Sequence, residues 1–418
     1  MSYACGGHDH RLSRRTMLGL MGGLALGRLA PAAPRSRARQ VLLIWLDGGL
    51  SQLESWDPKP QSPYGGPFRA IPTSADGIQV CELWPHTAKR MHRLALVRSM
   101  KTQDDSHSMG VPRMLRGDPV SRGVPYPYLG SAMAKFLPRE ASNDLPPYVW
   151  IKPRSGGFIW QHAGFLGPQF GALALGDGKP PATVHRPEEI GDARDAERQA
   201  LRKAANERFK AERLGSEVDA YESSYDVACR LMARKKVFTE APDRKDAERY
   251  GTHPLGRHLL QARALLEAGV SFVKVTSYHW DTHCDNFRMH QDMVPQVDRP
   301  FAALIDDLHD RGLLENVVVV LMSEFGRTPK INARWGRDHW PSAWSIALAG
   351  AGLKKGVAVG KTSPDGSWVD ESPYDVGHLF HTVFRAAGLD PDKLHYVNNG
   401  QPLPVLREDM GAIKEVLA

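Results

Sequence analysis

The stretch VLLIWLDGGLS (residues 41–51) decides the fold, because six consecutive apolar residues are followed abruptly by an acid and two glycines. Such a run is typical of a strand that is buried on both faces, as strands inside parallel sheets are. Open α/β sheets bind ligands at the carboxyl ends of their strands, which makes Asp47 a candidate site residue. Gly48 and Gly49 allow the backbone to turn sharply and to approach a bound group closely. The alternative is an ordinary Asp-Gly turn without a function.

The rest of the chain alternates between apolar strands and amphipathic helices. We expect further strands at 78–81, 94–97, 148–151, 271–276, 316–322 and 344–349, and helices at 85–92, 128–136, 255–268, 300–313 and 376–387. This alternation predicts an α/β fold with a mostly parallel sheet and helices on both faces. Residues 187–250 are rich in Ala, Glu, Arg and Lys at helical spacing. We interpret them as a helical insertion into a single domain that spans residues 34–418.

Residues 1–33 have the pattern of a twin-arginine export signal. SRRTML (13–18) carries the paired arginines, an apolar run extends to Gly27, and APA (30–32) resembles a cleavage site. We therefore expect recognition by the twin-arginine translocation machinery and export to the periplasm or the extracellular space. The alternative is a disordered basic tail. No other stretch is apolar and long enough to cross a bilayer.

The net charge gives little reason to expect a nucleic-acid partner. The formal charge of the whole chain is +7, and it falls to +4 once the basic export segment is removed. No long basic run with interleaved aromatic residues is found elsewhere. Nucleic-acid binding is therefore not expected.

Candidate metal ligands follow several of the expected strands or lie in the loops after them. They are Asp47; His107, flanked by Ser106 and Ser108; Asp281, His283 and Asp285; Glu324; and Asp338 with His339. Because the carboxyl ends of parallel strands share one edge of a sheet, these side chains are expected to converge. Carboxylates together with imidazoles suit zinc, manganese or iron, whereas ligand sets of oxygen alone suit calcium or magnesium. Taken singly, each cluster is better explained by a turn, a helix cap or a salt-bridged loop, and it is their joint occurrence that favours a site.

Five segments carry a resemblance to a known family: LDGGLSQLESWDPKP, HSMGVPRMLRG, ARALLEAGVSFVKVTSYHWDTH, SEFGRTPKIN and GRDHW. Together they resemble the bacterial family called domain of unknown function 1501, which belongs to the alkaline phosphatase/sulfatase superfamily. The resemblance implies a site for one or two divalent metal ions that flank a phosphate or sulfate ester. The implied ligands are Asp47, Asp281 with His283 or Asp285, Glu324 and His339.

The sequence departs from the superfamily pattern in two ways. Phe325 stands where the superfamily usually has a histidine beside the acid, so one metal would lose a ligand. The nucleophile position falls at Ser106-His107-Ser108, where His107 could ligate a metal instead of attacking. Sulfatases that form formylglycine use Cys-x-Pro-x-Arg, and the nearest match here, residues 284–288, lacks the proline. A formylglycine sulfatase is therefore not expected.

These observations favour an exported, metal-dependent hydrolase of phosphate or sulfate esters, with a small molecule or a polysaccharide as substrate. The expected metal ligands are Asp47, Asp281, His283, Asp285, Glu324, Asp338 and His339. Ser108 or Ser106 would be the nucleophile, unless a water bound to the metal attacks, and Arg327 would contact the anionic ester through two hydrogen bonds. The alternative is a non-catalytic binding or scaffold protein with a degraded site. An oxidoreductase is disfavoured, because the sequence has neither a GxGxxG nor a haem-attachment motif.

Overall fold

The computed structural model describes the chain from Gln40 onward, with gaps. The described residues are 40–117, 123–140, 143–152, 163–179, 187, 189–212 and 243–418, with short pieces between 218 and 239. The expected export signal at 1–33 lies outside them. Within the described part of the chain, every helix is too short or too polar to cross a membrane.

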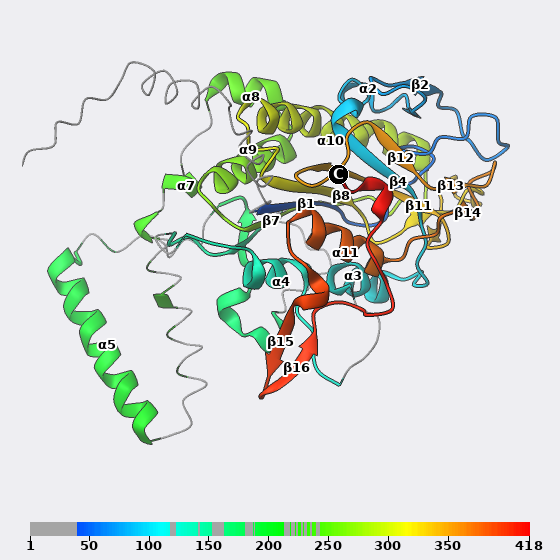
Figure 1. Ribbon diagram of the computed structural model, residues 1–418. Helices are drawn as coiled ribbons and strands as arrows, with labels where there is room; N and C mark the ends of the chain where they lie inside the picture. Colours follow the sequence, from blue (N-terminus) through cyan, green and yellow to red (C-terminus); the bar gives the residue numbers. More distant parts are fainter. Residues whose placement is uncertain are drawn as a thin grey trace, which may run out of the picture. The chain divides into compact units, whose positions relative to one another are not determined.

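A sheet of eight strands forms the centre of the molecule, in the order β12-β4-β11-β8-β1-β7-β5-β6 (Figure 1). Its strands are β1 (Gln40–Leu46), β4 (Leu94–Met100), β5 (Tyr148–Lys152), β6 (Leu173–Asp177), β7 (Phe272–Ser277), β8 (Val317–Met322), β11 (Trp344–Gly350) and β12 (Val357–Val359). Only β11 runs antiparallel to its neighbours β4 and β8. The mostly parallel sheet predicted from the sequence is therefore confirmed.

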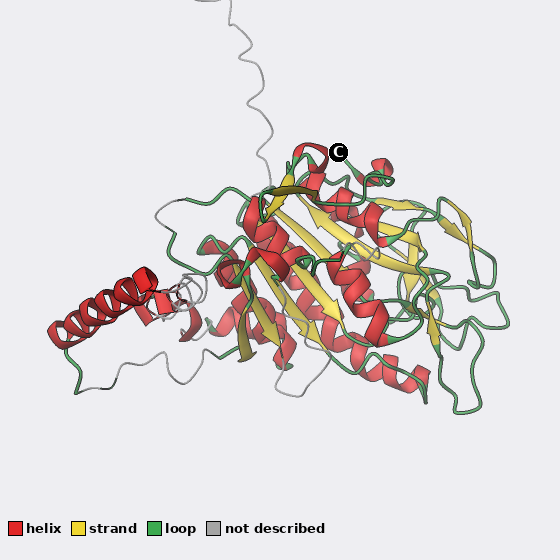
Figure 2. Ribbon diagram, turned by 90° about the horizontal axis from the view of Figure 1, so that it is seen from below, coloured by secondary structure: helices red, strands yellow, loops and turns green. Residues whose placement is uncertain are grey.

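Strand β1 is buried on both faces, as its apolar run predicts. Leu42, Ile44 and Leu46 belong to one hydrophobic cluster, together with apolar residues of α2 (Pro85–Ala88), α9 (Pro254–Glu267) and α10 (Asn286–Asp310). Val41, Leu43 and Trp45 belong to the other cluster, together with α3 (His107–Arg116), α4 (Leu129–Phe136) and α11 (Val376–Ala386). Helices thus cover both faces of the sheet (Figure 2).

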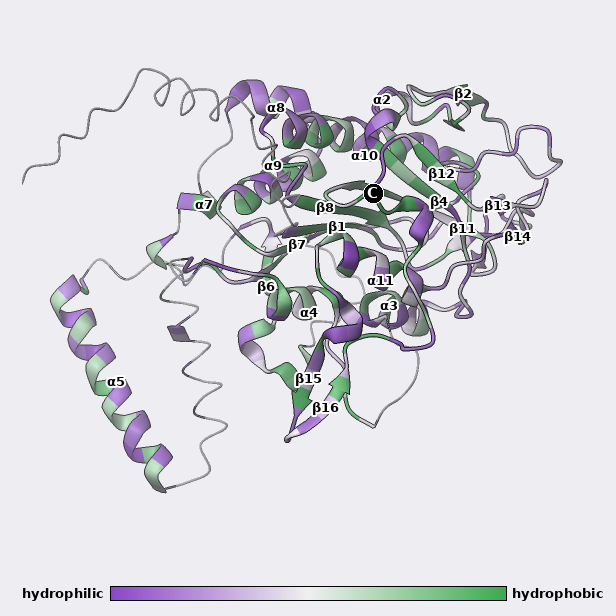
Figure 3. Cartoon of the chain, viewed as in Figure 1, coloured by the Kyte–Doolittle hydropathy of each residue, from purple (hydrophilic) through white to green (hydrophobic). Residues whose placement is uncertain are grey.

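The described part of 187–250 is helical, as expected. It contains α5 (Asp192–Glu212), α7 (Lys236–Thr239) and α8 (Arg244–Tyr250), which follow β6 and precede α9. Hydrophilic residues alternate with apolar ones along α5, whereas the central strands are largely hydrophobic (Figure 3). This difference agrees with an inserted helix that is solvated and a sheet that is buried.

The boundaries of some elements differ from the expected ones. The helix expected at 300–313 begins at Asn286 and includes both Pro295 and Pro300. Its extra turns are held by packing, because Val294 and Val297 are completely buried. The helix expected at 85–92 is only the single turn α2, followed by the 3-10 turn η1 (Met91–Arg93).

Short hairpins and turns complete the chain. The strand expected at 78–81 is β3 (Gln79–Cys81), which pairs with β2 (Ala70–Pro72) outside the main sheet. The other small pairs are β9 (Gly326–Arg327) with β10 (His339–Trp340), β13 (Lys361–Thr362) with β14 (Val369–Glu371), and β15 (His395–Asn398) with β16 (Gln401–Pro404). Further 3-10 turns are η2 (Gly164–Leu166), η3 (Pro168–Phe170), η5 (Pro391–Lys393) and η6 (Lys414–Val416).

Candidate metal centre

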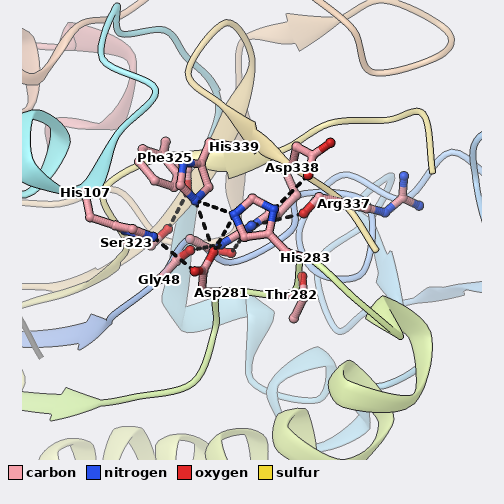
Figure 4. A network of polar contacts seen from close by, with 12 residues as sticks. Gly48, His107, Asp281, Thr282, His283, Ser323, Phe325, Arg337, Asp338 and His339 are labelled. Carbon is pink, nitrogen blue, oxygen red and sulfur yellow. Dashed lines mark hydrogen bonds and ion pairs between the residues drawn. The ribbon is translucent and has the colours of Figure 1, made fainter. Parts of the chain in front are cut away.

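The carboxyl ends of four strands bring the candidate residues to one edge of the sheet. Asp47 directly follows β1, and Glu324 lies two residues beyond β8. The loop after β7 carries Asp281 and His283, and the segment after β4 leads to His107 at the start of α3. The hairpin β9–β10 brings His339 to the same place, because Arg327 pairs with His339 in its register. The predicted convergence of these distant segments is visible in Figure 4.

Each of the three histidines is oriented by an acceptor at its Nδ1 atom. Nδ1 of His107 lies 2.7 Å from Oε1 of Glu324, and Nδ1 of His283 lies 2.7 Å from Oδ1 of Asp338. Nδ1 of His339 lies 2.6 Å from the carbonyl oxygen of Asp105. Because carbonyl and carboxylate oxygens only accept, Nδ1 carries the proton in each ring. In the neutral ring Nε2 then carries the lone pair that a metal ion would bind, whereas in the protonated ring Nε2–H donates to an acceptor.

The three Nε2 atoms converge on the carboxylate of Asp281. The Nε2 atoms of His339 and His283 lie 3.0 Å and 3.2 Å from Oδ1 of Asp281, and that of His107 lies 3.3 Å from Oδ2. One ligand atom from each of His107, Asp281 and His339 can be chosen so that all lie within 4.8 Å of one another. Without an ion, a protonated ring donates its Nε2–H to this carboxylate. An ion in the same space would instead be bound by the ring nitrogens together with the carboxylate. The donor set therefore fits a metal ion, and its nitrogen content suits zinc better than calcium or magnesium.

The charges at the centre are strongly coupled. Burial alone raises the pKa of Asp281, but hydrogen bonds from His107, His339 and Arg327 outweigh it and hold that pKa well below its usual range. Burial lowers the pKa of His107, yet its bonds with Asp281 and Glu324 prevail and raise it to about 9. A carboxylate that stays ionised at every ordinary pH is a suitable anionic ligand for a cation.

Arg327 lies at the centre, but not where an ester contact requires it. Its side chain is completely buried. Its guanidinium donates to the carbonyl oxygens of Gly48, Gly49 and Arg337, and to Oδ1 of Asp281. The expected bidentate contact with an anionic ester does not fit this arrangement, because the side chain is buried and four of its five N–H donors are used within the protein. Arg327 instead fixes Asp281 against the turn that follows β1.

Glu324 and Asp338 accept hydrogen bonds from histidines that surround Asp281. Neither belongs to the group of candidate ligands, which is His107, Asp281 and His339. Glu324 is buried, and its Oε1 also accepts from the backbone N–H of Gly48 at 2.9 Å. Asp338 accepts from Nδ2 of Asn332 at 2.9 Å in addition to its bond with His283. Such outer carboxylates fix the rotation and tautomer of a ligating imidazole. The structure thus brings these two predicted residues to the site, in an orienting position.

Asp47 is not one of these candidate ligands, and its side chain is directed to Trp45. Nε1 of Trp45 donates to Oδ1 of Asp47 at 2.9 Å. Burial, and next the nearby charge of Glu324, raise the pKa of Asp47 to about 6. Lys274 on β7 is a neighbouring buried charge that we did not predict, although a lysine within the otherwise apolar run FVKV was a visible signal. Its Nζ lies 4.9 Å and 4.2 Å from the ring centres of Trp45 and Trp150.

The predicted nucleophiles flank His107 at the amino end of α3. Ser106 is the residue before the helix, and its Oγ lies 3.3 Å from Oγ of the exposed Ser108. Asp285, also an expected ligand, is exposed at the start of α10 with a φ of 46° and lies outside the group of His107, Asp281 and His339.

Phe325 follows Glu324 at the sequence position where the resemblance described above implies a histidine. Its side chain is completely buried, and its ring centre lies 4.4 Å from that of His339 and 5.2 Å from that of His107. An aromatic ring in this position packs against the imidazoles but offers no ligand atom. The second metal position implied by the resemblance therefore lacks this donor.

A buried ion pair, which no sequence motif indicates, supports the segment that carries Asp338 and His339. Glu54 and Arg337 pair at 2.7 Å with both side chains fully buried. The backbone N–H of Arg337 also donates to the carbonyl oxygen of Thr282 at 2.9 Å. The pair thus fixes the β10 segment against the loop of Asp281 and His283. Only a three-dimensional arrangement could reveal this, because the two partners are 283 positions apart.

The fold and the site together define an α/β protein with a carboxylate–histidine centre at the carboxyl edge of its sheet. The chain belongs to the family described as Protein of unknown function (DUF1501), whose model matches residues 38–417. The family expected from the sequence is thereby confirmed. A comparison with curated proteins found no match.

Solved structures that match the chain include three proteins of low sequence identity. PsFucS1 sulfatase from Pseudoalteromonas is 13% identical, with a TM-score of 0.40 over 86% of this chain and 69% of its own. Alkaline phosphatase from the Antarctic bacterium TAB5 is 13% identical, with a TM-score of 0.38 over 85% of this chain and 100% of its own. The lipoteichoic acid synthase LtaP from Listeria monocytogenes is 10% identical, with a TM-score of 0.36 over 88% and 75% of the two chains.

Proposed function

We propose that the protein is an exported, metal-dependent hydrolase of phosphate or sulfate esters. One observation carries this proposal: three imidazole Nε2 atoms converge on the carboxylate of Asp281 at 3.0–3.3 Å, each oriented by an acceptor at its Nδ1. His107, Asp281, His283 and His339 would hold one ion. The residue types favour zinc or manganese over calcium or magnesium.

The chain supplies orientation and charge around such an ion. A bound divalent cation would polarise the ester and neutralise charge that develops in the transition state. Arg327 holds Asp281 in place, and Glu324 keeps Nε2 of His107 directed inward. The low pKa of Asp281 keeps the carboxylate anionic, so that it need not lose a proton when the ion binds.

The nucleophile would come from the amino end of α3 or from water. Ser106 and Ser108 flank His107 there, and the positive end of the helix dipole favours an ionised hydroxyl. Separate alanine substitutions decide between these alternatives. Loss of turnover in Ser108→Ala or in Ser106→Ala, at unchanged metal content, identifies a serine nucleophile. Full turnover in both variants indicates that water attacks.

The test of the function combines metal analysis with turnover of aryl phosphate and aryl sulfate esters. We expect one ion per chain in the purified protein, and loss of both metal and turnover in Asp281→Ala and His339→Ala. Asp76→Asn and His395→Ala are matched controls, because both side chains are exposed on other elements. Metal-free wild-type protein, or variants at 281 and 339 with wild-type metal content, would contradict the proposal.

A second candidate function is binding without turnover. It is favoured by the buried ring of Phe325 and by the burial of Arg327, which leave the centre with fewer ligands and one cation fewer than expected. This alternative predicts that the protein binds one ion and hydrolyses no phosphate or sulfate ester. Turnover that Asp281→Ala abolishes would exclude it.

Export by the twin-arginine route is a separate part of the proposal. It rests on the paired Arg14 and Arg15 and on the apolar run that follows them. Replacing both arginines by lysine should retain the precursor inside the cell, whereas the wild-type chain appears in the periplasmic or extracellular fraction. Unchanged export of the double variant would refute this route.

A further inference from the structure

Next to the metal centre lies an exposed segment of unusual composition, residues 330–335, which we call the basic lip. Its cations Lys330 and Arg334 are exposed, and so is the aromatic ring of Trp335, with 73% of its surface accessible. An aromatic ring with this much exposed surface is available for contact with another molecule.

The basic lip is fixed to the metal centre through Asn332. Its Nδ2 donates to the carbonyl oxygen of His283 at 3.1 Å and to Oδ1 of Asp338 at 2.9 Å. Its Oδ1 accepts from the backbone N–H groups of Arg334 at 2.9 Å and Gly336 at 3.0 Å. One side chain thus ties the lip both to a candidate ligand and to the carboxylate that orients it.

The backbone on either side of Trp335 also packs directly against the centre. Trp335 forms an isolated β-bridge with Cys284, the residue after His283. A Cβ atom on Gly336 would lie 2.0 Å from the carbonyl carbon of His283, so only glycine permits this approach. The position of Trp335 relative to the centre is therefore set by backbone contacts and not by its own ring.

Trp335 has a strained backbone as well as an exposed ring. Its φ is 59°, in the left-handed region that bulky residues avoid. The ring contributes little to the core, because most of its surface faces solvent. Backbone strain of this kind clusters at active sites and ligand clamps, which makes Trp335 a candidate for contact with a ligand.

We propose that the basic lip binds the sugar rings of an anionic polysaccharide ester beside the metal centre. This inference rests on the proposed function, since it names the substrate class of the same site. The apolar face of a pyranose ring would pack on Trp335, while Lys330 and Arg334 pair with its sulfate or phosphate groups. The lip thereby holds a polymer chain against the edge where Asp281 and His339 lie.

Binding of defined polymers to the metal-loaded protein tests this inference. The probes are dextran sulfate, phosphorylated dextran, neutral dextran and poly-L-glutamate, with affinities measured by calorimetry at 0.15 M salt. We expect one of the two anionic dextrans to bind, Trp335→Ala to weaken that binding at least tenfold, and Trp335→Phe to stay within about threefold of wild type. Phe209→Ala, at an exposed aromatic residue of α5, is the matched control and should bind as wild type does.

The two anionic dextrans distinguish sulfate from phosphate as the recognised group. The inference is overturned if neither binds, if Trp335→Ala binds as tightly as wild type, or if poly-L-glutamate binds as well as the dextrans, which would indicate attraction by charge alone. Loss of metal from Trp335→Ala would also overturn it, in favour of a purely structural lip. Turnover of small aryl esters is measured separately. Polymer binding through Trp335 without any such turnover would refute the proposed hydrolase activity, but it would still support polymer binding by the basic lip.

Discussion

The Nε2 atoms of His283 and His339 face each other at 3.0 Å, although each ring uses its Nδ1–H to bond an acceptor. Two neutral imidazoles in this state present lone pairs to each other and cannot form a hydrogen bond. A positive ion, either a proton or a metal, resolves this conflict. Since the carboxylate of Asp281 and the ring of His107 contribute donors to the same space, a metal ion resolves it for all of them together.

Metal removal should therefore destabilise the folded protein. An ion that binds only the native state adds about 4 kcal/mol to the free energy of unfolding when its free concentration is a thousand times Kd. Urea titrations with and without a chelator measure this difference. His339→Ala should show little response to the chelator, whereas the exposed control His395→Ala should respond as wild type does. Equal stability of chelated and metal-loaded wild type would contradict the prediction.

Replacing Arg327 by methionine should cost stability and metal affinity together. The substitution removes the donors of three backbone carbonyl groups and the cationic partner of Asp281, with an expected loss of about 3 kcal/mol in the free energy of unfolding. Metal affinity should fall by about tenfold, as it does when groups that orient ligands are removed. Arg69→Met is the control: this arginine is 85% exposed and pairs with Glu82, so its loss should cost at most about 1 kcal/mol. A similar small cost at Arg327 would contradict the assigned role.

Much of the fold followed from the sequence because the apolar runs are unambiguous. The run at 41–46 predicted a strand covered on both faces, and its alternate residues do pack into two separate clusters. The antiparallel direction of β11 was not predictable, because an apolar strand such as Trp344–Gly350 carries no signal of direction. The early start of α10 was hidden by Pro295 and Pro300, which are ordinarily read as helix breaks.

The sequence predicts which residues meet at the site better than it predicts what each residue does there. Residue types and strand ends indicated that Asp281, His283 and His339 would meet, but not that Glu324 would bond to the ring of His107. The ring orientations depend on acceptors such as the carbonyl oxygen of Asp105, and any residue can supply a carbonyl group. Asn332 likewise carries no signal in the sequence, since its four bonds exist only in the folded loop.

Lys274 should make stability depend on pH in a defined direction. Burial lowers the pKa of this lysine to about 7, from an ordinary value near 10.5. Between these values the unfolded chain binds more protons than the native protein, so the free energy of unfolding rises with pH. Relative to Lys274→Met, wild type should gain about 2 kcal/mol between pH 7.5 and 9.5. Denaturant titrations of both proteins across this range give the difference.

The control for this prediction is Lys89→Met, at an exposed lysine of the same chain. Water solvates that charge in both the native and the unfolded state, so the difference from wild type should stay constant over the same pH range. A constant difference for Lys274→Met as well would show that the buried lysine remains protonated throughout.

Trp335 allows backbone strain to be separated from ligand contact. Glycine normally destabilises an ordered position by about 0.5–1 kcal/mol relative to alanine, because it loses more conformational entropy on folding. At a φ of 59° the order should reverse, since alanine keeps the left-handed penalty of roughly 1–2 kcal/mol and glycine does not. We therefore expect Trp335→Gly to be about 1 kcal/mol more stable than Trp335→Ala in urea denaturation, while both lose polymer binding. The nearby exposed Ala333 is not among the residues with positive φ, so Ala333→Gly should instead lose stability. If Trp335→Gly is the less stable of the two variants, the backbone at position 335 is not strained as we infer.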